Sequence, residues 1–164
     1  MITHFKFTDD RPTREEMCMA VAHLMSFRGT CNRKKVGVAI AREGRILSTG
    51  YNSAPAGMPH CNHECDCDFA YGSHASTCSV EGICDVTIHA ELNAIVWAAR
   101  HGISLQGGDL FTTYAPCLNC AKAVINAGIK KFYYIEPYHK TEGLDLIVEA
   151  GLEVFDFTKK DMIW

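Results

Sequence analysis

The sequence has no uninterrupted apolar run long enough to cross a bilayer, although hydrophobic residues make up 48% of the chain. It also has no excess of positive charge: 16 lysines and arginines face 19 aspartates and glutamates, for a formal net charge of −3. Proteins that bind long nucleic acids depend on many phosphate contacts, so a nucleic acid polymer is not the expected substrate. The first ten residues are too polar for a secretory signal. We therefore expect a cytoplasmic protein with no membrane partner.

Repeats, low-complexity segments and domain linkers are absent as well, which predicts a single domain over residues 1–164. A β-hairpin is expected over 36–51, because two apolar runs flank a glycine-containing turn at 42–45. Further strands are expected at 109–114, 131–136 and 152–157, and helices at 13–27, 88–101, 117–127 and 142–150. Strands that alternate with helices predict a three-layer α/β/α sandwich with helices on both faces of the sheet.

The first expected helix has a clear start signal, because Thr13 and Glu16 form a T-x-x-E capping box. Its methionines are interpreted as core packing and not as cofactor contacts. The side chains expected to face the core are those of Met17, Ala20, Val21, Leu24, Met25 and Phe27.

Nine cysteines are many for a chain of this size without a secretory signal. Their odd number and the expected compartment argue against a disulfide framework and favour metal binding or reduced thiols. Residues 60–85 combine three histidines with five cysteines and show little apolar pattern. A second, structural zinc would order this segment. The alternative is a loop with incidental thiols, and the spacing does not select ligands among Cys61, Cys65, Cys67, Cys78 and Cys84.

Two short motifs dominate the remaining sequence: His89-Ala90-Glu91 and Pro116-Cys117-Leu118-Asn119-Cys120. Thr87 is the predicted N-cap of the first helix and Pro116 the predicted first residue of the second, so both motifs lie at helix starts. Helix N-termini favour anions, which makes two thiolates there easier to ionise and to offer to a metal.

One imidazole and two thiolates, from His89, Cys117 and Cys120, leave a fourth zinc position for water, as catalytic zinc sites do. Glu91, two residues from the histidine, is placed to take a proton from that water and pass it to a substrate. Taken alone, Cys-x-x-Cys could also be half of a zinc ribbon or a redox pair. Together, H-x-E and P-C-x-x-C form the known signature of zinc-dependent nucleobase deaminases.

With these motifs in view, residues 14–157 resemble the deoxycytidylate (dCMP) deaminases of the cytidine-deaminase superfamily. The metal and glutamate motifs are common to the superfamily. Two further features narrow the resemblance from the superfamily to the dCMP deaminases. One is Tyr138, after the fourth strand, and the other is the segment Gly50-Tyr51-Asn52-Ser53-Ala54-Pro55-Ala56-Gly57. It implies a five-stranded mixed sheet, a homohexamer, and zinc-dependent hydrolysis of dCMP to dUMP and ammonia, which supplies dUMP for dTMP synthesis.

The resemblance also implies roles for four residues that contact the substrate. Asn52 would bind the sugar, Tyr138 would stack on the pyrimidine, Arg33 would help to hold the 5′-phosphate, and Ala90 would line the base site. Stacking of a base on an aromatic ring is favourable in its own right. A mononucleotide needs only a local cluster of cations, for which the candidates are Arg28, Arg33, Lys34 and Lys35.

Members of this family are often activated by dCTP and inhibited by dTTP, with Mg²⁺ accompanying the bound triphosphate. The effector site is built around a Gly-Tyr-Asn-Gly segment, which corresponds here to Gly50, Tyr51, Asn52 and Ser53. A serine where glycine is usual alters the conformations open to the backbone, so regulation is expected to be sensitive to this position. The cysteine-rich segment 60–85 is consistent with family members that hold a second zinc.

Two other functions are compatible with parts of the pattern. One is another deaminase of the superfamily, acting on free cytidine, guanine or tRNA adenosine. The other is a non-catalytic interaction module that uses the cysteines of 60–85 as a zinc scaffold. The module interpretation gives Glu91 no task, whereas a requirement for the substrate phosphate would distinguish a dCMP deaminase from its relatives.

Overall fold

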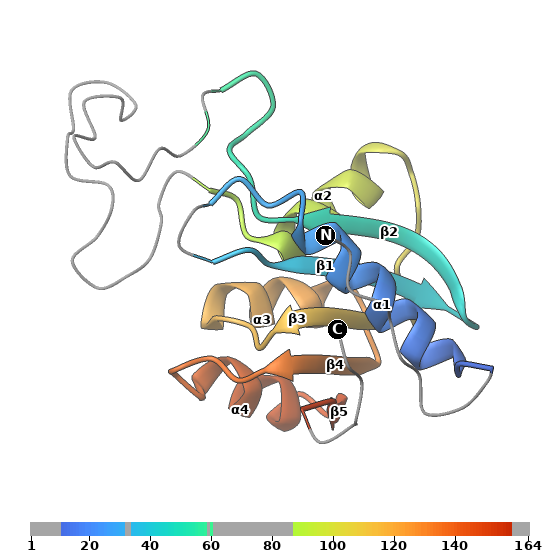
Figure 1. Ribbon diagram of the computed structural model, residues 1–164. Helices are drawn as coiled ribbons and strands as arrows, with labels where there is room; N and C mark the ends of the chain where they lie inside the picture. Colours follow the sequence, from blue (N-terminus) through green and yellow to red (C-terminus); the bar gives the residue numbers. More distant parts are fainter. Residues whose placement is uncertain (1–10, 32–33, 59, 61–86, 159–164) are drawn as a thin grey trace.

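A five-stranded mixed sheet forms the centre of the computed structural model, which describes residues 11–31, 34–58, 60 and 87–158 (Figure 1). The strands run in the order β2-β1-β3-β4-β5. β1 is antiparallel to both of its neighbours, whereas β3, β4 and β5 are parallel to one another. The mixed five-stranded sheet implied by the resemblance is confirmed. The strands are β1 (Gly37–Arg42), β2 (Arg45–Tyr51), β3 (Asp109–Tyr114), β4 (Lys131–Glu136) and β5 (Glu153–Asp156).

Helices cover both faces of this sheet, as the alternation of strands and helices predicts. One face packs against α1 (Arg14–Ser26) in a core cluster that includes Met19 and Phe111. The other face packs against α2 (Ala90–Arg100), α3 (Leu118–Asn126) and α4 (Glu142–Glu149) in a second, larger cluster. Figure 1 shows α1 lying across one side of the strands. Within the described ranges, no helix is long and apolar enough to traverse a bilayer.

The predicted hairpin is present as β1 and β2, joined by the two residues Glu43 and Gly44. Both have positive φ, 55° and 76°, as a tight type I′ turn requires. Two glycines then allow helices to approach this hairpin closely. A Cβ on Gly37 would lie 2.0 Å from the Ala22 carbonyl of α1, and a Cβ on Gly50 would lie 2.3 Å from the Ala90 carbonyl of α2.

The first helix starts as predicted, but the face that it buries only partly matches the prediction. The Thr13 side chain accepts from the Glu16 amide, and the Glu16 carboxylate accepts from the Thr13 amide at 2.7 Å. The prediction for its core-facing side is confirmed for Ala20, which is buried, and for Val21, which packs against the core cluster, but it is wrong for Met17, Leu24 and Phe27. The buried apolar residues are Cys18, Met19, Ala20 and Ala22, whereas Met17, Leu24 and Phe27 are 46%, 42% and 58% exposed.

The physical reason is that apolar residues occur on most sides of α1, so their pattern does not select one face. Small side chains determine which face is buried, because only a face with residues such as Ala22 can approach Gly37 closely.

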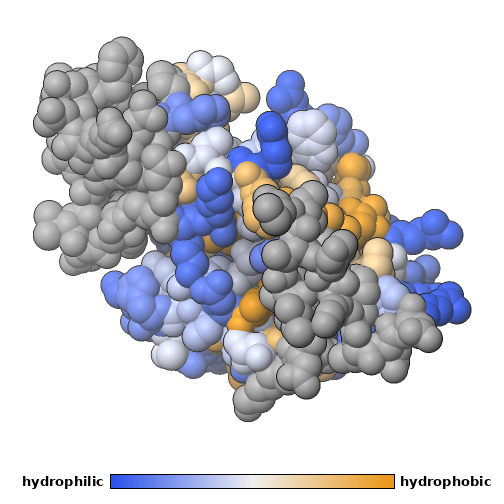
Figure 2. Space-filling model, in the orientation of Figure 1, coloured by the Kyte–Doolittle hydropathy of each residue, from blue (hydrophilic) through white to orange (hydrophobic). Residues whose placement is uncertain are grey.

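On the face of the molecule shown in Figure 2, the hydrophobic residues form separate patches between hydrophilic ones.

Several chain segments meet at one end of the sheet. The parallel strands β3 and β4 end there at Tyr114 and Glu136, which pair in the sheet. β2 ends at the same edge of the sheet, at Tyr51, which pairs with the first residue of β1, Gly37. In sheets of this type, ligands bind at the carboxyl ends of parallel strands, so a site is expected at this edge.

Candidate metal centre and active site

The two motifs expected at helix starts lie at the N-terminal ends of α2 and α3, with a small shift from the prediction. His89 is the N-cap of α2, and Cys117 is the N-cap of α3. Thr87 is therefore not the cap, and Pro116 precedes the helix instead of opening it. Neither His89 nor Cys117 uses its side chain to cap its helix, which leaves both side chains available to point toward each other.

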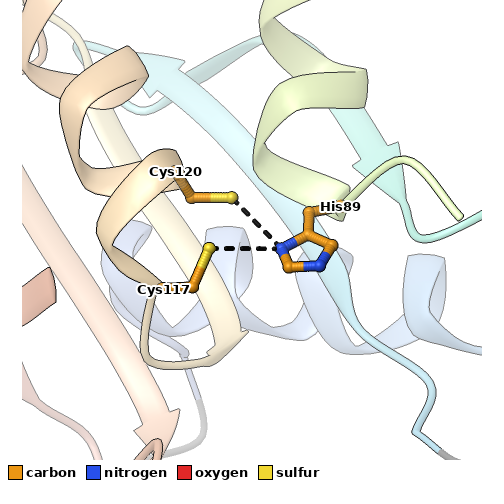
Figure 3. Close-up of side chains that lie close together, drawn as sticks. All are labelled: His89, Cys117 and Cys120. Atoms are coloured by element: carbon orange, nitrogen blue, oxygen red, sulfur yellow. Dashed lines mark hydrogen bonds between the residues drawn. The ribbon is translucent and has the colours of Figure 1, made fainter. Parts of the chain in front are cut away.

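His89, Cys117 and Cys120 converge on one point, as the sequence predicts (Figure 3). The Nδ1 atom of His89 lies 3.4 Å from the Sγ atom of each cysteine. A tetrahedral zinc with bonds of ~2.3 Å to sulfur and ~2.1 Å to nitrogen separates such ligand atoms by about 3.6 Å. The three side chains therefore fit zinc. Within the described ranges this cluster has three members, the number found in catalytic rather than structural zinc sites.

The pKa values of the two thiols at this point are shifted in opposite directions. A hydrogen bond from the Cys120 thiol, aided by the His89 ring, lowers the pKa of Cys117 to about 4. The same hydrogen bond and burial raise the pKa of Cys120. The pair thus shares a proton that a divalent cation would displace, because metal ions bind the thiolate form.

Glu91 lies in the first turn of α2 and is almost completely buried, with 4% of its surface exposed. Burial is the main cause that raises its pKa, and the charge of Cys117 adds to it, while the His89 ring acts in the opposite direction. A carboxyl group with a raised pKa gains and loses protons more easily near neutral pH than an exposed one. Glu91 is therefore suited to proton transfer and not to a structural ion pair.

A cavity of about 290 Å³ opens beside the metal ligands. Its size is near the lower end of the range of ~300–1,000 Å³ typical of small-molecule sites, which suits a mononucleotide. Its lining includes His89, Ala90, Glu91 and Cys117, together with Asn52 and Tyr138. The structure thus brings together most of the residues that the sequence analysis assigned to the site.

Asn52 and Tyr138 each have a defined environment in this cavity. The Asn52 amide donates to the Lys34 carbonyl at 2.7 Å and accepts from the Val36 amide at 2.8 Å. The Tyr138 ring lies edge-on to Tyr114, with ring centroids 6.2 Å apart. Asn52 thus holds the loop before β1, in addition to facing the cavity.

Of the predicted effector segment, Asn52 lines the cavity, whereas Gly50, Tyr51 and Ser53 lie outside its lining but are tied to the site. Ser53 and Ile88 exchange backbone hydrogen bonds of 3.2 and 2.8 Å, directly before His89. The Asn93 amide of α2 donates to the Tyr51 carbonyl at 2.8 Å. Gly50 packs under α2 with no room for a side chain. A backbone shift in this segment can therefore move His89, because Ser53 is bonded to the preceding residue, Ile88, and Tyr51 is bonded to Asn93 of α2.

Other predicted residues lie outside the described part of the chain. These are Arg33, expected at the phosphate, and the five cysteines expected at a second metal: Cys61, Cys65, Cys67, Cys78 and Cys84.

Several residues that line the cavity were not predicted from the sequence, among them Tyr114 and Ala115. A signal for Tyr114 was present, because it is the last residue of a strand that leads directly to Pro116 and Cys117. Lys34 was predicted only as one of four candidate cations for a mononucleotide, and nothing in its sequence context distinguishes it from Lys35.

Comparison with known proteins agrees with this geometry. Residues 12–136 match the family model described as the cytidine and deoxycytidylate deaminase zinc-binding region. The chain belongs to the cytidine and deoxycytidylate deaminase family. The matched region includes His89, Glu91, Cys117 and Cys120, whereas Tyr138 lies two residues beyond its end. As a member of this family, the protein is a deaminase with a zinc-binding region, in agreement with its His/Cys/Cys cluster.

Individual relatives of this deaminase are similar over most of their length. The deoxycytidylate deaminase of Enterobacteria phage T4 is 37% identical, over 88% of this chain and 90% of that protein. ComE operon protein 2 of Bacillus subtilis is 35% identical, over 94% of this chain and 76% of that protein. The crystal structure of a cyanophage S-TIM5 dCMP deaminase in complex with dCMP and dUMP has a TM-score of 0.74 and 33% identity. The match covers 90% of this chain and 99% of the cyanophage chain. The expected cytidine-deaminase-like fold is confirmed.

Proposed function

We propose that this protein is a dCMP deaminase that hydrolyses dCMP to dUMP and ammonia. The observation that carries the proposal is the convergence of His89, Cys117 and Cys120 beside the buried carboxyl of Glu91, in one cavity of mononucleotide size. Relatives named deoxycytidylate deaminase support the choice of substrate, as does the related cyanophage enzyme with dCMP and dUMP. Release of dUMP would supply the precursor of dTMP.

In this proposal His89, Cys117 and Cys120 hold zinc. When bound there, zinc supplies Lewis-acid chemistry that makes a water nucleophilic near neutral pH. Among the described residues the cluster has three members, which would leave a fourth zinc position for water and substrate. A second, structural zinc in residues 60–85 remains part of the proposal.

Glu91 moves the protons of the reaction. Its carboxylate takes one proton from the attacking water and gives it to N3 of the cytosine, while the water oxygen bonds to C4. It then takes the second proton of that oxygen and gives it to the amino group, and the C4–N bond breaks. Ammonia leaves, and the base keeps a C4 carbonyl and a protonated N3. Burial of Glu91 supports this role, because a raised pKa lets one carboxyl both accept and donate.

The cavity orients the base and the sugar. Tyr138 supplies an aromatic face for the pyrimidine, Asn52 has one amide hydrogen beyond its bond to the Lys34 carbonyl for the sugar, and Ala90 leaves room beside Glu91. Arg33 is proposed to contribute to phosphate binding. Among the lining residues that the structure describes, Lys34 is the single lysine and no arginine joins it, which suits a mononucleotide better than a nucleic acid polymer.

Regulation and assembly complete the proposal. The segment Gly50–Ser53 is bonded to the residues around His89, which supports its role as the site where dCTP activates and dTTP inhibits, each with Mg²⁺. The exposed apolar side chains of Val96 and Trp97 on α2 support association into a homohexamer. Mass photometry is expected to show six chains of 18.2 kDa in one particle, and a stable monomer would contradict the assembly.

The test of the activity is a substrate comparison. Zinc-loaded protein is incubated with dCMP, deoxycytidine, cytidine, guanine and a tRNA, and ammonia release is measured with and without dCTP and dTTP. The proposal predicts the highest kcat/KM for dCMP. Faster turnover of a free nucleoside, of guanine or of tRNA adenosine would assign the protein to another activity within its family. Zinc binding without release of ammonia from any of them would favour a non-catalytic module.

A further inference from the structure

One permanent positive charge faces the cavity from the described part of the chain. Among the lining residues that the structure describes, Lys34 is the single lysine, and no arginine joins it. Arg28, the described arginine of the basic region 28–35, lies instead near the ring of Tyr51, with its Cζ atom 5.8 Å from the ring centroid. A nucleoside monophosphate brings a phosphate with a charge close to −2, which needs a cation at the site that receives it.

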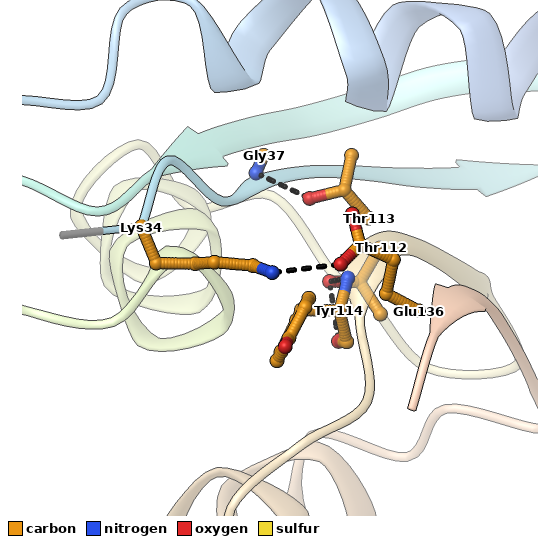
Figure 4. A network of polar contacts seen from close by, with 6 residues as sticks. All are labelled: Lys34, Gly37, Thr112, Thr113, Tyr114 and Glu136. Atoms are coloured by element: carbon orange, nitrogen blue, oxygen red, sulfur yellow. Dashed lines mark hydrogen bonds and ion pairs between the residues drawn. The ribbon is translucent and has the colours of Figure 1, made fainter. Parts of the chain in front are cut away.

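Three side chains hold Lys34 in place beside the cavity, and Figure 4 draws two of them, Glu136 and Tyr114. The amide of Asn52 fixes its backbone by accepting from Val36 and donating to the Lys34 carbonyl. The Nζ atom lies 2.7 Å from Oε2 of Glu136 at the end of β4. The same atom lies 3.8 Å from the centroid of the Tyr114 ring at the end of β3. Asn52 thus holds the backbone of Lys34, and residues at the ends of β3 and β4 position its ammonium group before any substrate arrives.

The ion pair with Glu136 is open to exchange. The two side chains are 43% and 55% exposed, so water screens their charges and the pair contributes little to stability. A phosphate dianion carries more charge than one carboxylate and accepts several hydrogen bonds, so it competes well for the same ammonium group. Glu136 repels a phosphate that approaches Lys34, and the carboxylate must therefore give up the lysine when the nucleotide binds.

We propose that Lys34 is the counter-ion of the substrate's 5′-phosphate, and that it makes the cavity select a nucleoside monophosphate over the nucleoside. Glu136 and Tyr114 hold its ammonium group at the cavity mouth, and Glu136 exchanges it for the phosphate. This inference rests on the proposed dCMP deaminase function and assigns a phosphate contact to Lys34. It adds this side chain to the proposed contact of Arg33, which lies outside the described residues.

The decisive experiment compares Lys34→Gln with the neighbouring Lys35→Gln. Lys35 is exposed and does not line the cavity, so it is a control for the loss of one charge from the same loop. The measured quantity is the ratio of kcat/KM for dCMP to kcat/KM for deoxycytidine. Loss of a charge-assisted contact is expected to lower this ratio about 10- to 100-fold in Lys34→Gln, chiefly through KM. The ratio is expected to stay within about twofold in Lys35→Gln.

A binding measurement removes the dependence on turnover. Calorimetric titration with dUMP and with deoxyuridine is expected to show weaker dUMP binding in Lys34→Gln, and recovery of most of the affinity in Lys34→Arg. Glu136→Gln keeps a hydrogen-bond acceptor for Lys34 but removes the competing charge. This variant is expected to bind dUMP two- to fivefold more tightly than the wild type.

The outcomes separate this inference from the function on which it rests. An equal loss with dCMP and deoxycytidine in Lys34→Gln would mean that the lysine only supports the loop, and the inference would be overturned while dCMP deamination stands. An equal fall of the ratio in Lys35→Gln would point to general surface charge and overturn it too. Weaker dUMP binding in Glu136→Gln would contradict the exchange. Absence of dCMP turnover in the wild type would instead refute the proposed function.

Discussion

At the scale of single residues, the described thiols differ in their readiness to ionise. Cys117 has its pKa lowered to about 4, because a neighbouring thiol donates a hydrogen bond to its sulfur. Cys18, on α1 and 3% exposed, has its pKa raised from 9.0 to about 11 by burial and by the nearby carboxylates of Glu15 and Asp109. The first environment suits a metal ligand and the second suits a core residue that stays a thiol.

Replacement of a predicted ligand should remove one zinc. Cys120→Ser places a harder oxygen where zinc prefers a thiolate, so zinc affinity is expected to fall at least tenfold. Zinc content is measured by native mass spectrometry after dialysis against a weak chelator, and Cys18→Ser serves as the matched control. The account expects one zinc fewer per chain in Cys120→Ser alone. Equal zinc content in both variants would contradict the ligand assignment.

The buried thiol of Cys18 makes a separate prediction about alkaline stability. Its pKa is higher in the folded protein than in the unfolded chain, so its contribution is complete below pH 9 and is lost as the pH rises toward 11. A shift from 9.0 to about 11 corresponds to about 3 kcal/mol. Urea unfolding at pH 8 to 11 should therefore show a smaller decline for Cys18→Ala than for the wild type. Parallel declines in the two proteins would show that Cys18 does not contribute.

At the scale of elements, α2 is positioned by its contact with β2, and this contact sets the place of His89. The Gly50 backbone of β2 touches the first turn of α2, where an added Cβ would lie 2.3 Å from the Ala90 carbonyl and 2.7 Å from the Ala94 amide. No side chain can be accommodated there unless the helix moves. His89, the proposed metal ligand, and Glu91, the proposed proton carrier, both lie at that turn.

Gly50→Ala is therefore expected to cost about 1–3 kcal/mol of stability and to weaken zinc binding, because overpacking displaces the helix start. Gly102→Ala is the control at the other end of α2. Its φ of 65° makes alanine strained there, by about 1 kcal/mol, but no atom lies within 4 Å of its Cβ position. Thermal unfolding and zinc affinity are measured for both variants. If Gly102→Ala weakened zinc binding as much as Gly50→Ala, the positioning argument would be incorrect.

The local structure of several elements follows from the sequence, whereas their faces and exact ends do not. The turn at Glu43 and Gly44 is encoded by a few adjacent residues, and so is the capping box at Thr13. The start of α2 was misplaced at Thr87, because threonine is a good N-cap and histidine is not. His89 occupies the cap position because its side chain faces the two cysteines and not its own helix.

At the scale of the whole molecule, the sheet order decides which distant residues meet. Lys34 and Glu136 are 102 residues apart and become neighbours because β1 and β4 both lie beside β3. Spacing along the chain carries no information on such a pair. The zinc cluster was predictable for the opposite reason, since its chemistry restricts the residue types and their local spacing. The five-stranded mixed sheet was expected from family resemblance, whereas the order of its strands was not predicted, because local patterns define strands and not their neighbours.

The most direct test of the central claim is the rate of dUMP formation by zinc-loaded Glu91→Gln beside the wild type, at equal zinc content. Glutamine keeps the shape of the side chain but cannot take a proton from water. Loss of general acid–base catalysis is expected to lower the kcat of Glu91→Gln by a factor of about 10²–10⁴, while this variant still binds zinc. The wild type is expected to form ammonia and dUMP in equal amounts. A Glu91→Gln rate within tenfold of the wild type would contradict the account.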